Sequence, residues 1–262
     1  MTKLEIKLKQ IKNVNKIGLM THVVIGYPTL EITINIVKTM AEKGVDFVEL
    51  QIPFSDPLAD GPTIMRASER SLENGTKVKD AFKAMEYLSS HVSIPLLFMA
   101  YYNTVFKYGV EKFCRDSQST GASGLIVPDM SIDEENEEHF LASCRKYKLH
   151  NIQVISPVST DDRLKKNSAV ANGFIYCTAR QGITGASDQL DPNLTSYLQR
   201  LRKYFSIPIA VGFGISKKEH IKMLAPIVDI AVVGSAIIDI IHSSRRDNLE
   251  RKISDFLDNL KV

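Results

Sequence analysis

The stretch VDFVELQIPFSDPLADGPTI, from Val45 to Ile64, begins as a buried strand and continues as a polar loop. It carries two carboxylates eleven residues apart, Glu49 and Asp60, and the prolines between them stiffen the loop. In α/β enzymes, a strand that leads into a long polar loop is where the catalytic residues usually lie. The stretch therefore predicts an α/β enzyme, provided that strands and helices alternate along the rest of the chain.

Eight short segments rich in apolar and β-branched residues recur along the chain, with helical patterns between them. Such runs are typical of parallel strands that are covered on both faces. The segments begin at Leu19, Asp46, Pro95, Ser123, Ile152, Phe174, Pro208 and Asp229. Eight βα units in 262 residues predict an α/β fold, a (β/α)8 TIM barrel made of a single domain, residues 1–262. An open doubly wound sheet is the alternative.

Capping patterns indicate where the helices begin. Candidate starts are Thr29, Ser131 with Glu134, Asp191 before Pro192, and Ser216 with Glu219. The Lys-rich segment at residues 3–16 predicts an extra amphipathic helix at the N-terminus with one solvated face. The run AIIDII, which follows Gly234 and Ser235, predicts a short helix after the eighth strand.

Charge and cysteine content narrow the class of protein. The 33 basic and 30 acidic side chains are mixed, so we expect no nucleic-acid partner. The chain shows neither a signal-peptide pattern nor an apolar run near the roughly 20 residues that span a bilayer. Cys114, Cys144 and Cys177 lie far apart and show no metal or redox spacing. We expect a cytoplasmic protein with buried thiols, no metal site and no membrane contact.

The alternation of side chains along a strand orients Glu49. Val48, Leu50 and Ile52 form an all-apolar face that should pack against helices, so Glu49 and Gln51 should face the barrel interior. A carboxylate there is costly unless it is hydrogen-bonded or protonated. A buried carboxylate paired with a basic neighbour is the structural alternative for Glu49, and a simple turn is the alternative for Asp60.

Glycines at the ends of the last two strands indicate a phosphate site. The seventh strand ends in Gly212-Phe213-Gly214, and the eighth ends in Gly234-Ser235 before the short helix. In barrels of this type these loops often bind phosphate through backbone N–H groups and a helix N-terminus. Each glycine by itself is also compatible with a tight turn.

From about Leu19 to Leu260, the sequence resembles the tryptophan synthase alpha chain family. The motifs that carry the resemblance are VELQIPFSDPLADGP from Val48, MAYYN from Met99, GLIVPD from Gly124, ARQGITG from Ala179, GFGIS from Gly212 and GSAI from Gly234. The resemblance implies a carbon–carbon lyase of tryptophan biosynthesis. That lyase cleaves indole-3-glycerol phosphate to indole and glyceraldehyde 3-phosphate in a retro-aldol reaction.

The resemblance also implies a role for each site residue. Glu49 would be the proton donor and acceptor, and Asp60 would bind the indole nitrogen and stabilise its developing positive charge. Thr184, with its loop, would close over the substrate and order Asp60. Phosphate would be held by Gly185, Gly212, Phe213, Gly214, Gly234 and Ser235. The indole would be bound by His22, Ile64, Met99, Tyr101 and Ile126, with Tyr176 beside the catalytic pair.

The family's partner is a beta subunit in an α2β2 heterotetramer. Pyridoxal phosphate is expected on that subunit alone, so no cofactor is expected on this chain. The resemblance places Asp56 and Asp129 in segments that face the partner or its loops. Two alternatives remain open: a weakly catalytic alpha-type subunit that mainly binds and activates the beta subunit, and another phosphate-binding barrel enzyme.

Three features near the site depart from the family pattern, one of them the turn Ile25-Gly26-Tyr27-Pro28 in place of an Ala-Gly-Asp-Pro type turn. Gln51 replaces the usual glycine, and His22 replaces a phenylalanine that commonly faces the indole. We expect His22 to lie on the interior face of its strand as a neutral, packed side chain. Together the two residues are expected to narrow the indole pocket or change its polarity.

Overall fold

Eight parallel strands close into a barrel in the computed structural model, which describes residues 1–178, 192–212 and 214–261. Each strand pairs with the next, and β8 pairs with β1, so the predicted barrel is confirmed and the open sheet is excluded. The strands are β1 (Gly18–Val24), β2 (Phe47–Gln51), β3 (Leu96–Met99), β4 (Gly124–Ile126), β5 (His150–Ile155), β6 (Ile175–Thr178), β7 (Ile209–Gly212) and β8 (Ile230–Val233).

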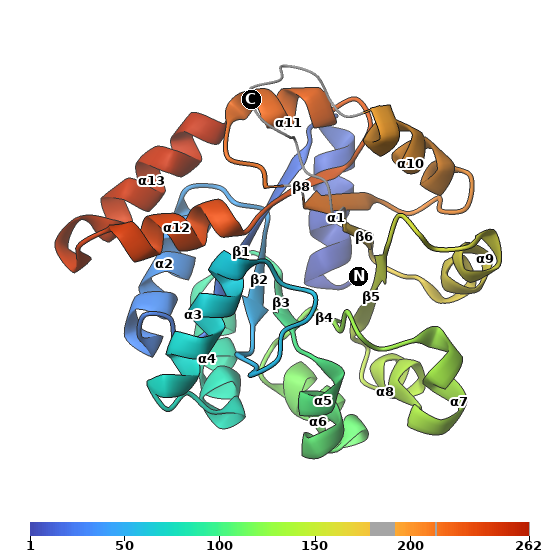
Figure 1. Ribbon diagram of the computed structural model, residues 1–262, viewed down its shortest axis with the longest axis horizontal. Helices are drawn as coiled ribbons and strands as arrows, with labels where there is room; N and C mark the ends of the chain where they lie inside the picture. The colour runs from blue at the N-terminus through green and yellow to red at the C-terminus, as the bar shows by residue number, and fades with distance from the viewer. Residues whose placement is uncertain (179–191, 213, 262) are drawn as a thin grey trace.

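The chain also forms helices, which except for α1 surround the strands on the outside of the barrel (Figure 1). They are α1 (Lys3–Asn13), α2 (Leu30–Glu42), α3 (Pro62–Glu73), α4 (Val78–His91), α5 (Tyr102–Tyr108), α6 (Val110–Ser119), α7 (Glu135–Glu138), α8 (Phe140–Lys146), α9 (Asp161–Val170), α10 (Pro192–Arg202), α11 (Lys218–Leu224), α12 (Ser235–Ser243) and α13 (Leu249–Leu260), with 3-10 turns η1 (Ile132–Glu134) and η2 (Arg246–Asn248). The short helix expected after the eighth strand is α12.

The apolar residues form two separate cores. Val48, Leu50 and Ile52 of β2 belong to the layer between the strands and the helices. Phe47 of the same strand belongs to the core inside the barrel. The alternation expected for β2 is therefore confirmed, and it turns Glu49 inward.

Helix α1 belongs to the interior core and not to the outer ring. Thr2 caps it in a capping box with Glu5, and its buried face carries Leu4 and Ile11. These two side chains pack with the barrel-interior residues Met20, Phe47 and Phe174, among others. The predicted amphipathic helix thus has its apolar face against the interior of the barrel and leaves the other face solvated.

Two of the expected capping boxes are wrong. The Ser131 hydroxyl accepts from Asp133 N and from the Arg163 guanidinium, which leaves a 3-10 turn in place of a helix start. Glu135 instead caps α8, because its carboxylate accepts from the backbone N–H groups of Leu141 and Ala142 at 2.6 and 2.8 Å. The local pattern did not reveal which carboxylate would fold back onto the helix end.

At the second box, α11 begins after Lys217, and Ser216 N donates to His220 Nδ1 at 3.3 Å. The start of α2 after Thr29 is confirmed, since the Thr29 hydroxyl accepts from Ile32 N. At the other end of α2, Gly44 follows the helix at a positive φ of 79°. Asp191 lies outside the described residues.

All three cysteines are free and buried, as predicted. They are less isolated than their spacing indicated, because Cys114 Sγ of α6 lies 3.8 Å from Cys144 Sγ of α8. Packing of two helices 30 residues apart brings the thiols together. In the described part of the chain, none of the helices combines the length and apolar character that crossing a membrane requires.

We expect Leu4→Ala to destabilise the protein by about 2–5 kcal/mol, because Leu4 is fully buried against the barrel interior. Ile6→Ala on the same helix is the matched control, since Ile6 is 44% exposed. Its effect should stay below about 1 kcal/mol. Urea unfolding monitored by circular dichroism measures both variants. Equal losses would show that α1 does not seal the barrel.

Candidate active site

A cavity of about 190 Å³ opens at the carboxyl ends of the strands. Every strand contributes to it, either directly or through the residue that follows it. Its lining contains nine of the residues predicted from the sequence, namely His22, Glu49, Asp60, Ile64, Met99, Ile126, Tyr176, Gly212 and Gly234. The fold therefore brings both carboxylates into one hollow with apolar walls.

Glu49 and His22 face each other on neighbouring strands, because the register of β1 and β2 pairs them. His22 Nδ1 lies 3.3 Å from Glu49 Oε2, and the two side chains are 5% and 4% exposed. The distance is that of an ion pair, but the atoms are not aligned as a hydrogen bond. Within the described residues, Glu49 Oε2 and His22 Nε2 have no hydrogen-bond partner.

The charges around His22 change its expected ionisation. Burial lowers the pKa of His22, but the neighbouring Glu49 and Asp60 carboxylates outweigh burial and raise the pKa above its usual value. The imidazole therefore keeps its proton to a higher pH than an ordinary histidine does. The prediction of an interior side chain is confirmed, and the raised pKa moves His22 away from the neutral, merely packed state that was expected.

Gln51 and Tyr101 hold the loop that carries Asp60. Gln51 is fully buried, and its Nε2 donates to Asp60 Oδ2 at 2.6 Å. Ala59 N donates to the Tyr101 hydroxyl at 3.0 Å, and the Tyr101 ring stacks on Phe54 with centroids 5.1 Å apart. Tyr101 was expected to line the indole pocket, but it supports the loop and is absent from the cavity lining.

The Asp60 carboxyl feels opposing influences. Burial raises its pKa, whereas the nearby His22 and the hydrogen bonds from Gln51 and Tyr101 favour the ionised form. The net pKa is raised. Asp60 is thus more than a turn residue, although the turn chemistry is also present, since Gly61 is the N-cap of α3 and Pro62 its first residue.

Tyr176 and Gly212 face each other on β6 and β7. A Cβ atom at Gly212 would approach the Tyr176 hydroxyl to 3.0 Å, so glycine leaves room for the phenol. Burial, together with the charges of Glu49 and Asp60, raises the pKa of Tyr176 well above its usual value. The phenol stays neutral beside the carboxylates and remains able to donate a hydrogen bond.

Of the predicted phosphate residues, Gly212 and Gly234 line the cavity, whereas Gly214 and Ser235 follow the ends of β7 and β8 without lining it. Gly214 has a positive φ of 66°, a conformation that favours glycine. Gly234 is the N-cap of α12, and Ser235 is the first residue of that nine-residue helix. Phe213, Thr184 and Gly185 were also predicted to bind substrate, but they lie outside the described residues.

Five lining residues were missed by sequence reasoning: Ala59, Gly61, Pro128, Val154 and Thr178. A signal for two of them was available. Thr178 lies two residues after Tyr176 on β6, and Val154 pairs with Tyr176 across β5 and β6. Alternation along these strands would have placed both side chains inside the barrel.

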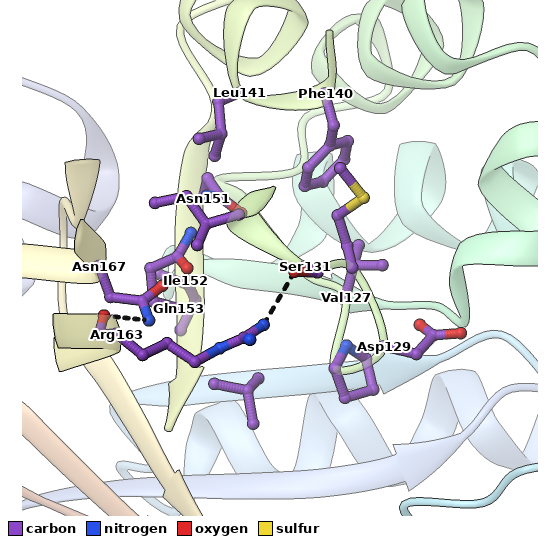
Figure 2. A pocket seen from close by; sticks show the side chains of 14 residues that line it. Val127, Asp129, Ser131, Phe140, Leu141, Asn151, Ile152, Gln153, Arg163 and Asn167 are labelled. Atoms are coloured by element: carbon purple, nitrogen blue, oxygen red, sulfur yellow. Dashed lines mark hydrogen bonds between the residues drawn. The ribbon is translucent and has the colours of Figure 1, made fainter. Parts of the chain in front are cut away.

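A second cavity, of about 110 Å³, lies outside this site (Figure 2). The loop after β4, strand β5 and helices α8 and α9 surround it. Arg163 Nη2 reaches across it to donate to Ser131 Oγ at 2.8 Å. Neither Glu49 nor Asp60 lines it, but Pro128 and Val154 line both cavities, so the second cavity adjoins the one with the paired carboxylates.

No group of three or more His, Cys, Asp or Glu side chains within the described ranges is arranged to hold a metal ion. Two carboxylates, one beside a histidine and one beside an amide, can divide the transfer of a proton and the stabilisation of a positive charge.

The family model and the similar proteins found by sequence comparison carry the same description. A sequence model described as "Tryptophan synthase alpha chain" matches residues 8–261. The tryptophan synthase alpha chain of Desulfotalea psychrophila is 41% identical over 98% of this chain and 99% of that protein. The Petrotoga mobilis alpha chain is 40% identical over 95% and 96% of the two chains.

Solved structures agree with the sequence relatives. The crystal structure of tryptophan synthase subunit alpha from Legionella pneumophila is 27% identical and aligns with a TM-score of 0.89. The alignment covers 99% of this chain and 97% of that one. The chain therefore belongs to the tryptophan synthase alpha chain family.

Proposed function

We propose that this chain cleaves indole-3-glycerol phosphate to indole and glyceraldehyde 3-phosphate in the cytoplasm, as a single domain of residues 1–262. The observation that carries the proposal is the pair Glu49 and Asp60 on one cavity of a chain that belongs to this family. Carbon–carbon cleavage needs an acid at one atom and a stabilised charge at another. The two carboxylates have unlike neighbours and are suited to these separate tasks.

Glu49 is assigned the proton transfers. Its carboxyl gives a proton to the ring carbon of indole that is to be released, and its carboxylate accepts the proton of the side-chain hydroxyl. The bond between the two carbons breaks, and its electron pair returns to the ring while the hydroxyl carbon becomes an aldehyde. The enzyme ends in the protonation state in which it began, so protons and electrons balance.

Asp60 is assigned the indole nitrogen. Protonation of the ring carbon places positive charge on that nitrogen, and a nearby carboxylate stabilises it. Burial raises the pKa of Asp60, and the donors around it limit that rise and so favour the charged form. Met99, Ile126 and Ile64 on the same lining provide the apolar walls for a flat aromatic ring.

The phosphate of the substrate is assigned to the loops after β7 and β8. Gly214 and Gly234 allow close backbone approach, and the N-terminus of α12 at Ser235 offers N–H groups and a favourable dipole. His22 lies between Glu49 and Gly234 in the cavity. Its imidazole lies beside Glu49, and its Cβ lies 3.6 Å from a Cβ built on Gly234.

We assign a beta subunit as partner, at the face that carries the cavity. Three large apolar side chains are exposed in segments that follow β2, β3 and β5, namely Leu58 at 86%, Phe106 at 54% and Val158 at 88%. Exposed apolar groups in segments that follow the strand ends beside a cavity are typical of a protein interface. Indole released at this end would leave the cavity beside the partner.

Glu49→Gln should lower kcat for indole release by about 10²–10⁴-fold, because the amide neither donates nor accepts the transferred proton. Asp60→Asn should cost about 10- to 100-fold, the value of a hydrogen bond to a charged group. Indole release is measured with and without a beta subunit. Silence of the wild type under both conditions would contradict the lyase assignment, and full activity of Glu49→Gln would contradict the role of Glu49.

Ser235→Ala should raise KM for indole-3-glycerol phosphate by about tenfold and change kcat little, because the lost hydrogen bond is made equally in ground and transition states. Steady-state kinetics with the substrate and with its dephosphorylated analogue measure the effect. Only the phosphorylated compound should respond. An equal loss with both compounds would indicate a packing role for Ser235.

Val158→Asp should raise the concentration of beta subunit needed for half-maximal stimulation, because a desolvated charge at an apolar contact is costly. Val14→Asp is the matched control, since Val14 is 68% exposed and follows α1, away from the cavity. Titration of the beta subunit into the cleavage assay measures both variants. The same curve for both would place the partner elsewhere.

A further inference from the structure

We propose that His22 and Gln51 are positioning residues for the cleavage reaction: His22 is the ion-pair partner of Glu49 and carries the proton that Glu49 delivers, and Gln51 holds Asp60. The two pairs are connected through β2, on which Glu49 and Gln51 lie two residues apart. The inference rests on the proposed function and deepens it, because it names what prepares each carboxylate for its task.

The contact between His22 and Glu49 is fixed by the barrel itself. The register of β1 and β2 places the two residues side by side on the interior face, so no loop has to move to bring them together. Both side chains are more than nine-tenths buried, with 3.3 Å between Nδ1 and Oε2. A carboxylate so deeply buried is costly unless an opposite charge accompanies it.

His22 is the basic side chain available for that purpose. Among the described residues that line the cavity there is no lysine or arginine. The titratable groups that face His22 are Glu49 on β2, Asp60 on the loop after it and Tyr176 on β6. Two of these are carboxylates and the third is a neutral phenol, so the surroundings favour a charged imidazole.

Gln51 connects the second carboxylate to the same group. Its carboxamide is fully buried, its Nε2 donates to Asp60 Oδ2 at 2.6 Å, and its position is two residues beyond Glu49 on the same interior face. Within the described residues, Oε1 of Gln51 has no hydrogen-bond partner. A glycine at this position would remove the donor that positions Asp60.

The proton balance of the reaction shows what the pair supplies. At rest the proton is on His22 and Glu49 is ionised. Transfer of that proton to Glu49 makes the carboxyl that protonates the ring carbon, and the carboxylate left behind accepts the proton of the substrate hydroxyl. Return of this proton to His22 restores the resting pair, so no proton is consumed and no co-reactant is required.

The first test reads the proton directly and does not depend on activity. The imidazole resonances of His22 are titrated by NMR in the wild type and in Glu49→Gln. The proposal expects a wild-type midpoint above 6.5, the ordinary value, and a lower midpoint in the variant. His150 is the internal reference, because burial lowers its pKa. A His22 midpoint at or below 6.5, or one unchanged in Glu49→Gln, overturns the proposal.

The second test is the pH profile of kcat/KM, which reports the ionisations of the free enzyme. In the wild type, activity should fall as the pH rises through the pKa at which the pair loses its proton. In His22→Phe the proton must reside on Glu49 alone. Because the imidazole that keeps its proton to a higher pH than an ordinary histidine is lost, the basic limb should shift.

His22→Gln is the second variant, in case the phenylalanine changes the packing. His150→Asn is the matched control, since His150 is also a buried strand histidine but binds Thr2 and Asn172, away from the cavity. Its variant should change stability and leave the basic limb in place. A basic limb that stays in place in both His22 variants overturns the proton-carrying role.

Gln51→Gly tests the other half of the network. We expect kcat/KM to fall about tenfold or more, as loss of a hydrogen bond to a charged group predicts, with a much smaller change in the urea midpoint. A midpoint change equivalent to the loss of kcat/KM would instead indicate packing and overturn the positioning role.

The outcomes also separate this inference from the proposed function. If the wild type does not release indole, the proposed function fails, while the NMR titration still decides whether His22 carries the proton. If the wild type is active and Glu49→Gln is not, but His22 titrates as an ordinary histidine, the function stands and only the inference fails.

Discussion

The buried carboxylate of Glu49 is the constraint that the rest of the site satisfies. β2 is apolar on the face toward the helices, so its other face, with Glu49, has to point into the barrel. An ionised group there loses most of its hydration. His22 from the neighbouring strand compensates for that loss at 3.3 Å, and the cavity at the carboxyl ends gives the pair access to a ligand.

The two ends of the barrel perform different tasks. At one end, α1 fills the interior with Leu4 and Ile11, which pack with Phe47 from below the site. At the other end the interior stays open, and polar side chains on strand ends and loops replace apolar packing. The same strand, β2, therefore contributes a core residue at Phe47 and a charged residue at Glu49. Stability and chemistry are separated along the strand and not between domains.

The structural and functional explanations of the site residues turn out to be compatible. Glu49 is paired with a basic neighbour, as its structural alternative required, and it also lines the cavity. Asp60 belongs to a turn that starts α3, and it is also held by Gln51. Gln51 stood out in the sequence as a departure from the family pattern. In the structure it is the donor that gives Asp60 a fixed position.

Sequence alone determined the eight strands and the inward direction of Glu49, because periodicity and alternation are local properties of a chain that packs both faces of a sheet. It predicted the barrel, but only the pairing of β8 with β1 excluded an open sheet. It also marked the glycines at the strand ends. Tertiary structure decided which partners meet: His22 with Glu49, Gln51 with Asp60, Tyr101 with the loop, Glu135 with the end of α8, and Cys114 with Cys144. These contacts depend on strand register and helix packing, and the ionisation of His22 depends on them in turn. No local pattern encodes the distance between side chains that the fold brings together from different elements.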